Sequence, residues 1–188
     1  MSDKTPFYIA LVHYPVYNKN MEVIATSITN LDIHDISRSA CTYGVEKYYL
    51  VHPNENQQKV TRNIIEYWQQ GFGSKYNTDR KRAFSAISLK NSLEEVKKEI
   101  KDVHGLEPKV IATDARIYPN SLAYQEMKAM IKADEHPYLL LFGTGWGLEA
   151  KELEAADYFL EPIYGTGDYN HLSVRAAAAI ILDRLFGR

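Results

Sequence analysis

The chain of 188 residues is long enough for one domain with a hydrophobic core, and its 45% hydrophobic and 24% charged residues are typical of a soluble globular protein. A net charge of −2 gives no global attraction to nucleic acid or to an anionic membrane, so a polyanion would have to meet a local patch. The single cysteine, Cys41, excludes an internal disulfide and a cysteine-clustered zinc site. The apolar run before His13 is too short for a signal peptide or a membrane span, which favours a cytoplasmic protein.

Apolar runs and helix signals alternate along the whole chain, without an internal repeat or an interdomain linker. The expected elements are strand 7–12, helix 33–43, strand 45–51, helix 54–69, strand 86–89, helix 92–103, strand 109–113, helix 121–132, strand 138–142, helix 151–155, strand 158–160 and helix 172–186. This alternation predicts one α/β domain, residues 1–188, with a mostly parallel sheet flanked by helices in a Rossmann-like arrangement.

Local signals set several of these boundaries. Gly44 is expected to end the first helix, and Asn54 to cap the next. In that second helix Val60, Ile64 and Trp68 recur at four-residue spacing, which gives it one apolar face. The segment that follows it, GSKYNTDRKRAF at residues 73–84, is interpreted as a basic loop.

The first glycine turn, GTGWGL at residues 143–148, follows a buried strand and precedes a helix. Ligands of open α/β sheets bind at this position, beyond the carboxyl ends of the strands. The spacing lacks the third glycine of the dinucleotide fingerprint and lies in the last quarter of the chain, which argues against a nicotinamide or flavin site. The pattern alone fits a ligand loop and a tight structural turn about equally.

The second glycine turn, YGTGDYNHL at residues 164–172, leads into a helix with four consecutive alanines, residues 176–179. Asn170 or His171 can present a side chain at the start of this helix, where the helix dipole favours a negative group such as a ligand carboxylate. The alternative is a small-residue helix packed on the sheet, with Asn170 as an ordinary cap.

Acidic and basic side chains recur every third residue in the first helix, at Asp32, Asp35 and Arg38. This spacing places them near one face. A simple ion pair between Asp35 and Arg38 would contribute a few tenths of a kcal/mol. Such a pair does not explain why His34 and both aspartates gather at the N-terminal end of the helix.

The basic segment carries a local excess of three positive charges and includes Tyr76 and Phe84. Basic residues beside aromatic rings suit phosphates and unpaired bases, although a solvated surface loop fits as well. The candidate RNA-binding residues are Lys75, Arg80, Lys81 and Arg82.

Three stretches together resemble the SPOUT superfamily of RNA methyltransferases, α/β proteins with a deep C-terminal trefoil knot. DIHDISRSACTYGVEKYYLV is similar to the first motif of that group, LLLFGTGWGL to the second, and the run from LEPIY to NHLSVRAAAAI to the third. The resemblance covers nearly the whole chain. It implies a homodimer that binds S-adenosylmethionine, releases S-adenosylhomocysteine, acts on RNA, and needs neither a metal nor a membrane.

The resemblance also implies site residues. The knot would occupy about residues 108–188. Arg38 is at the position of the motif's arginine, near the transferred methyl group or the substrate. Methyl transfer also needs a proton acceptor, for which Asp35, Asp32 and His34 are the candidates, so the predicted catalytic residues are Arg38, Asp35, Asp32 and His34. The implied cofactor-binding residues are Thr113, Asp114, Leu141, Phe142, Gly143, Thr144, Gly145, Gly147, Leu148, Leu160, Glu161, Pro162, Ile163, Asn170, His171, Leu172, Ser173 and Ala176.

The chain departs from the 2′-O-ribose members of the superfamily at three points. It lacks a glutamate between the glycines of the second motif, has Asp32 in place of an asparagine, and has Asn170-His171-Leu172 in place of Ser-Leu-Asn. A base nitrogen and a ribose 2′-oxygen, in tRNA or rRNA, both stay open as targets. Two alternatives remain: a catalytically silent dimeric RNA-binding or assembly module, and a methyltransferase that acts on a non-RNA substrate.

Overall fold

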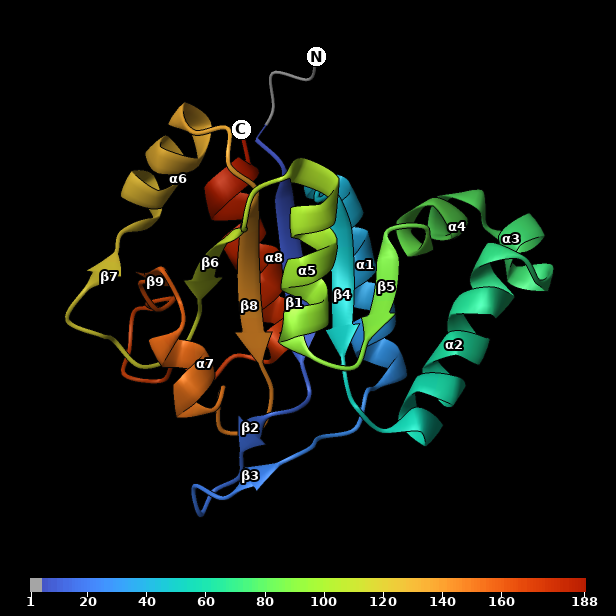
Figure 1. Ribbon diagram of the computed structural model, residues 1–188, viewed down its shortest axis with the longest axis horizontal. Helices are drawn as coiled ribbons and strands as arrows, with labels where there is room; N and C mark the ends of the chain where they lie inside the picture. Colours follow the sequence, from blue (N-terminus) through green and yellow to red (C-terminus); the bar gives the residue numbers. More distant parts are fainter. Residues whose placement is uncertain (1–4) are drawn as a thin grey trace.

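The computed structural model describes residues 5–188 and contains a seven-stranded parallel sheet in the order β5-β4-β1-β8-β6-β9-β7 (Figure 1). The sheet strands are β1 (Phe7–Val12), β4 (Lys47–Val51), β5 (Ile87–Lys90), β6 (Lys109–Ala112), β7 (Ser121–Leu122), β8 (Tyr138–Gly143) and β9 (Tyr158–Leu160). The helices are α1 (Asn30–Tyr43), α2 (Glu55–Gln69), α3 (Phe72–Tyr76), α4 (Thr78–Phe84), α5 (Leu93–His104), α6 (Tyr124–Ala133), α7 (Ala150–Glu154) and α8 (Val174–Phe186). The predicted α/β class with a mostly parallel sheet is confirmed.

The core lies on both faces of the sheet. In β1, Phe7, Ile9 and Leu11 pack with α1, α6 and α8, whereas the alternate residues pack with α5 and α7. Figure 1 shows the second pair of helices in front of the sheet, with α1 and α8 behind it. All six residues of β1 are buried, as expected for a parallel strand covered on both sides.

The expected basic loop is wrong, because residues 72–84 form the two short helices α3 and α4. Asn77 begins α4 by accepting a hydrogen bond from the backbone N–H of Arg80. The sequence signal for this start is the Asn77 cap, which was hidden among the charged residues. On the predicted apolar face of α2, Ile64 and Trp68 pack against the core, whereas Val60 is 60% exposed. The fully buried residues of α2 are Thr61 and Ile65.

Two further elements differ from expectation. Residues 121–122 form the edge strand β7, and α6 begins only at Tyr124. A hairpin of β2 (Val16–Tyr17) and β3 (Val23–Ile24) was not predicted, because two-residue strands carry almost no pattern. This hairpin matters for the site, since Tyr17 exchanges backbone hydrogen bonds with Trp146 and Gly147 of the first glycine turn.

Candidate functional site

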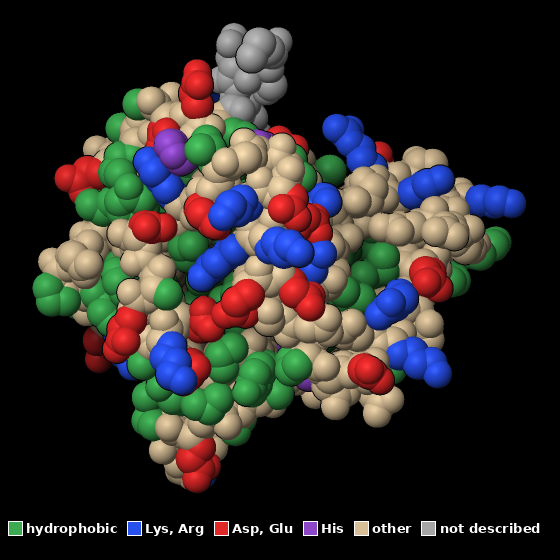
Figure 2. Space-filling view, viewed as in Figure 1, with side chains coloured by type: hydrophobic (Ala, Val, Ile, Leu, Met, Phe, Trp, Pro, Cys, Tyr) green, Lys and Arg blue, Asp and Glu red, His purple; other side chains and the backbone are tan. Residues whose placement is uncertain are grey.

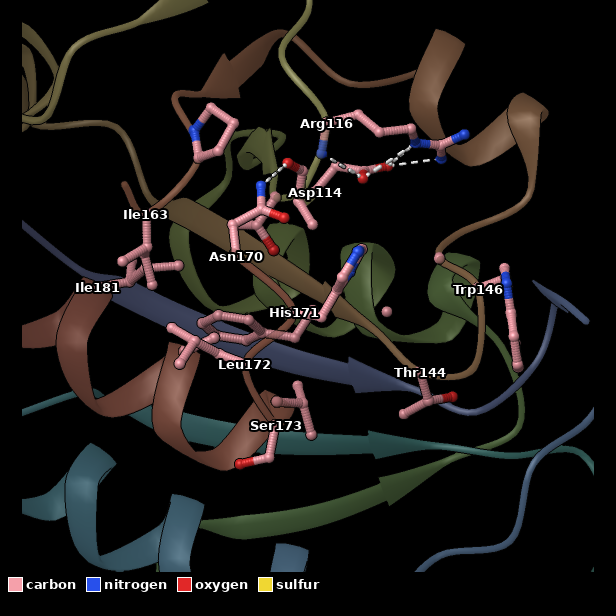
Figure 3. A pocket seen from close by; sticks show the side chains of 18 of the residues that line it. Asp114, Arg116, Thr144, Trp146, Ile163, Asn170, His171, Leu172, Ser173 and Ile181 are labelled. Carbon is pink, nitrogen blue, oxygen red and sulfur yellow. Dashed lines mark hydrogen bonds and ion pairs between the residues drawn. The ribbon is translucent and has the colours of Figure 1, made fainter. Parts of the chain in front are cut away.

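A pocket of about 720 Å³ lies at the carboxyl ends of β6, β8 and β9 (Figure 3). Its size is within the range of roughly 300–1,000 Å³ that is typical of small-molecule sites. Its walls are the loop after β6, the first glycine turn, the segment after β9 and the residues that lead into α8, with Met21 of the hairpin at the rim. Segments far apart in the sequence meet here because parallel strands end at one edge of the sheet.

Most of the predicted cofactor residues line this pocket. They are Thr113, Asp114, Phe142, Gly143, Thr144, Gly145, Gly147, Glu161, Pro162, Ile163, Asn170, His171, Leu172 and Ser173. Four others do not line it: Leu141, Leu148 and Leu160 are buried in the core, and Ala176 lines a second hollow. Sequence reasoning missed the lining residues Met21, Ala115, Arg116, Tyr124, Trp146, Val174, Ala177 and Ile181.

The first glycine turn packs against the hairpin of β2 and β3 as well as lining the pocket. Gly145 and Gly147 have φ values of 62° and 104°, which favour glycine. A Cβ at Gly145 would lie 2.7 Å from the backbone oxygen of Tyr17. The turn is therefore at once a wall of the pocket and a tight structural junction with the hairpin.

A partly buried chain of hydrogen bonds supports the same turn. Thr144 Oγ1 donates to the backbone oxygen of Val12 over 3.0 Å and lies 2.5 Å from Thr26 Oγ1. Thr26 Oγ1 in turn lies 3.0 Å from His13 Nδ1. If His13 carries its proton on Nδ1, it donates to Thr26 Oγ1, and Thr26 donates to Thr144 Oγ1. Both hydroxyl groups then have a donor and an acceptor as partners. Burial, followed by the neighbouring His52, lowers the pKa of His13 to about 4, so its ring is neutral near pH 7.

Polar side chains from two segments close the opposite wall. The carboxylate of Asp114 accepts hydrogen bonds from Arg116 over 2.7 Å and from the hydroxyl of Tyr118 over 3.0 Å. The side-chain amide of Asn170 donates to the backbone oxygen of Ala115 over 2.6 Å. This bond ties the segment before α8 to the loop after β6, as Figure 3 shows.

Two of the four predicted catalytic residues, Asp35 and Arg38, line a second hollow between α1 and α8. Ser173 lines both the pocket and this hollow. The simple ion pair between Asp35 and Arg38 is not formed. Instead, the carboxylate of Asp35 lies 3.3 Å from the guanidinium of Arg175. The same guanidinium lies 3.7 Å from the carboxylate of Asp32. Arg175 was missed because only folding brings α8 against α1.

The other two candidates, Asp32 and His34, line neither cavity. Asp32 is 7% exposed and accepts a hydrogen bond from Thr29, the residue that caps α1. The ring of His34 lies against those of Trp68 and Phe84, at centroid distances of 5.3 and 4.7 Å. Burial, followed by nearby Arg80, lowers the pKa of His34. Their catalytic role stays a prediction.

The predicted RNA-binding residues lie apart from the pocket, on α3 and α4. Lys75, Lys81 and Arg82 are exposed, whereas the guanidinium of Arg80 lies 4.7 Å from the ring centroid of Trp68. Among residues 5–188, no group of three or more His, Cys, Asp or Glu side chains could hold a metal ion. No helix in the same range is long and apolar enough to cross a membrane.

Residues 6–187 match the model of a family described as SAM-dependent RNA methyltransferase. The chain belongs to this family. The match confirms the family resemblance that the three sequence motifs carry, and S-adenosylmethionine is the cofactor of such enzymes.

Relatives and solved structures agree with this assignment. An uncharacterised protein of Aquifex aeolicus is 44% identical over 96% of this chain and 88% of its own length. A tRNA (guanine-N(1)-)-methyltransferase of Nitratidesulfovibrio vulgaris is 45% identical over 96% of this chain, yet the match spans only 42% of that enzyme. The AdoMet-bound rRNA methyltransferase of Sinorhizobium meliloti superposes with a TM-score of 0.58 at 17% identity, over 97% of this chain and 56% of that one, which shows the shared fold.

The pocket residues fit S-adenosylmethionine. Phe142, Pro162, Ile163, Leu172 and Ile181 give the pocket an apolar side that suits a purine ring. Asp114 and Glu161 supply carboxylates that suit ribose hydroxyls and the positive charge of the cofactor. Trp146 and Thr144 stand on the side away from Ile163 and Ile181 (Figure 3).

Proposed function

We propose that this chain transfers a methyl group from S-adenosylmethionine, held in the pocket at the carboxyl ends of β6, β8 and β9, to a nucleotide of tRNA or rRNA. The observation that carries the proposal is the position of Ser173, which lines both the pocket and the hollow of Asp35 and Arg38. A nucleotide placed beside Ser173 would meet the cofactor from one side and these charged groups from the other.

Methyl transfer requires the methyl group and the attacking atom to be aligned, and it requires a proton acceptor. When bound, S-adenosylmethionine supplies a methyl group from its sulfonium sulfur. As that S–CH₃ bond breaks, the sulfur becomes the neutral thioether of S-adenosylhomocysteine. The Asp35 carboxylate would take the proton from the attacking nitrogen or oxygen. Arg38 is permanently charged and would bind a phosphate of the substrate. Arg175 would hold Asp35 in place through the contact at 3.3 Å.

The second hollow also supports a homodimer. Its floor includes the small side chains of Ala176 and Ala179, and it opens outward between α1 and α8. Leu31 and Leu172 are among the apolar side chains exposed on α1 and just before α8. A partner subunit that covers this face would exclude water from Asp35 and Arg38. A cytoplasmic location follows from the proposed RNA substrate.

The knot at residues 108–188 stays part of the proposal. Glu161, directly after β9, donates its backbone N–H to Leu122 of β7, and Asn170 bonds to Ala115, so the segment between β9 and α8 runs from β7 to the loop after β6. Such contacts fit a C-terminal segment that passes through the preceding loop. Strands from residue 7 to residue 160 form one sheet, and α8 packs with the core of that sheet, which supports a single domain.

The target atom is the open part of the proposal. More than half of the named guanine-N(1) relative lies outside the match, so guanine N1 is one candidate among base nitrogens, alongside the ribose 2′-oxygen. Mass spectrometry of tRNA and rRNA nucleosides from a deletion strain would identify the missing methyl group. Restoration by the wild-type chain but not by Arg38→Ala would assign it to this enzyme.

Calorimetry with S-adenosylmethionine and S-adenosylhomocysteine tests the cofactor step directly. Absence of binding at millimolar ligand would defeat the proposal and favour a silent RNA-binding or assembly module. Transfer of a tritiated methyl group to protein or small molecules, but not to RNA, would favour the alternative substrate class.

A further inference from the structure

A helical arm, α2 to α4 (residues 55–84), extends beyond the β5 edge of the sheet (Figure 1). It carries six Lys and Arg against three Asp and Glu, a net charge of +3, whereas the remainder of the chain, which totals −2, carries −5. Figure 2 shows Lys and Arg side chains spread over this arm, on the right of the view. The arm is therefore a cationic surface on a protein that is otherwise acidic.

Two aromatic rings stand exposed at the end of the arm. Phe72 and Tyr76 are 69% and 77% exposed, and their rings stack at a centroid distance of 6.2 Å with an angle of 21° between their planes. Exposed rings forgo the stabilisation that burial would give, so a pair of them on one face points to a partner.

Close packing fixes the backbone that carries these rings. A Cβ at Gly73 would lie 2.7 Å from the Trp68 ring and 2.8 Å from that of Tyr67. A Cβ at Gly71 would lie 2.8 Å from the backbone oxygen of Tyr67. The absence of a side chain at these two glycines thus allows α3 to pack closely against α2. The backbone that carries Phe72 and Tyr76 is therefore set before any partner arrives, which lowers the entropy cost of binding.

The arm is also fixed to the rest of the domain. Trp68 and Phe84 pack with His34 of α1, and Arg80 lies over the ring of Trp68. The exposed cations around this anchor are Lys59, Arg62, Lys75, Lys81 and Arg82. A rigid support with an aromatic pair and surrounding cations matches the surfaces that bind single-stranded nucleic acid, where rings stack on bases and cations meet phosphates.

We propose that the arm binds an unpaired segment of RNA, with bases stacked on Phe72 and Tyr76 and phosphates held by Lys75, Lys81 and Arg82. Base faces are accessible only where RNA is unpaired, so a duplex would not use the rings. This inference rests on the proposed RNA methyltransferase function. The arm lies beyond β5 at one edge of the sheet (Figure 1), whereas the pocket lies at the ends of β8, β6 and β9, beyond β4 and β1 in the strand order. The arm would therefore hold RNA away from the reacting nucleotide.

The test uses the full chain and fluorescence anisotropy with a labelled 12-nucleotide oligouridylate, a 12-nucleotide oligoadenylate and a 12-base-pair RNA duplex. The double variant Phe72→Leu/Tyr76→Leu should weaken binding of the single strands by about tenfold or more, because stacking is lost while apolar side chains remain. Phe72→Tyr and Tyr76→Phe keep a ring and should bind as the wild type does. The wild type should bind the duplex more weakly than the single strands, and none of the four substitutions should change duplex binding.

A charge pair tests the phosphate contacts. Lys75→Glu/Lys81→Glu should weaken single-strand binding and flatten its salt dependence. The matched control, Lys98→Glu/Lys132→Glu, makes the same charge change on exposed lysines of α5 and α6 and should have little effect. Equal losses in both variants would show a nonspecific charge effect and overturn the proposal.

Other results would also overturn it. Unchanged single-strand binding in the ring variant would remove the stacking role, as would an equal loss for the duplex. A changed sedimentation coefficient in the ring variant, with RNA binding intact, would make the arm a protein contact. Circular dichroism on each variant establishes that it is folded.

Enzyme kinetics separate this inference from the proposed function. Calorimetry should show unchanged binding of S-adenosylhomocysteine in the arm variants, because the arm does not line the pocket. With an RNA substrate, the ring variant should raise KM about tenfold and leave kcat unchanged, the signature of uniform binding. Lost kcat would assign the rings to catalysis and refute the remote role. Failure of the wild type to bind the cofactor would defeat only the proposed function.

Discussion

The guanidinium of Arg175 on α8 lies 3.3 Å from the carboxylate of Asp35 on α1, so the C-terminal helix positions the candidate proton acceptor. Arg175→Ala should lower kcat for methyl transfer by about tenfold through misplacement of Asp35. Stability should fall by less than about 1 kcal/mol, because both side chains are partly exposed. Steady-state kinetics and urea unfolding measure the two effects.

A double-mutant cycle shows whether Arg175 acts through Asp35. Asp35→Ala should lower kcat more strongly than Arg175→Ala does, and the combined variant should match Asp35→Ala alone. Additive losses would mean that Arg175 acts independently. Arg175→Lys should recover part of the rate, since it keeps the charge.

Gly145→Ala should destabilise the chain by about 1–2 kcal/mol, because a side chain at a φ of 62° is strained and its Cβ would meet the backbone oxygen of Tyr17. The displaced turn should also weaken binding of S-adenosylhomocysteine by about tenfold. The matched control is Gly167→Ala in the second glycine turn, where a Cβ meets no atom within 4 Å. Thermal unfolding and calorimetry measure stability and ligand binding in both variants. Equal losses in Gly145→Ala and Gly167→Ala would contradict this account.

The stability of the chain should fall as the pH drops from about 6.5 to 4. Burial lowers the pKa of His13 from 6.5 to about 4, so the unfolded chain binds a proton more readily than the folded chain over this interval. The stabilisation is present above pH 6.5 and is lost progressively below it, by at most about 3 kcal/mol. Burial lowers the pKa values of His34 and His52 as well, which acts in the same direction.

Urea unfolding at pH 7.5 and pH 5 measures this dependence. His13→Asn keeps a donor for Thr26 and removes the titrating ring, so its free energy of unfolding should change less between the two pH values. An equal change in the variant and the wild type would exclude His13 as the source.

His34→Phe should keep methyl-transfer activity, because the His34 ring packs against Trp68 and Phe84 and lines neither cavity. The free energy of unfolding should stay the same or rise, since Nδ1 of His34 is buried and has no hydrogen-bond partner among residues 5–188. A folded variant with a kcat reduced a hundredfold would return His34 to the catalytic residues.

Local pattern predicted most of the elements, and the family resemblance implied most of the pocket residues. The apolar run 7–12 became β1 without a shift, and the Asn54 cap began α2 as expected. The resemblance of three short motifs to a known family implied Asp114, Thr144 and Ile163 as cofactor residues, and all three line the pocket. The failures concern short segments: α3, α4, β2, β3 and β7 span two to seven residues each, too few for a periodic signal.

The sequence by itself determined the α/β class and the two glycine turns of the pocket, because strand hydrophobicity, helix caps and glycine conformations act over a few neighbouring residues. Its three motifs, through their resemblance to known proteins, indicated the family. Only the tertiary structure decided which side chains meet across long separations. It paired Arg175 with Asp35, turned His34 toward Trp68, and left Phe72 and Tyr76 exposed on the arm. These contacts depend on how helices pack on a sheet, and that packing is set by the whole core rather than by any local pattern.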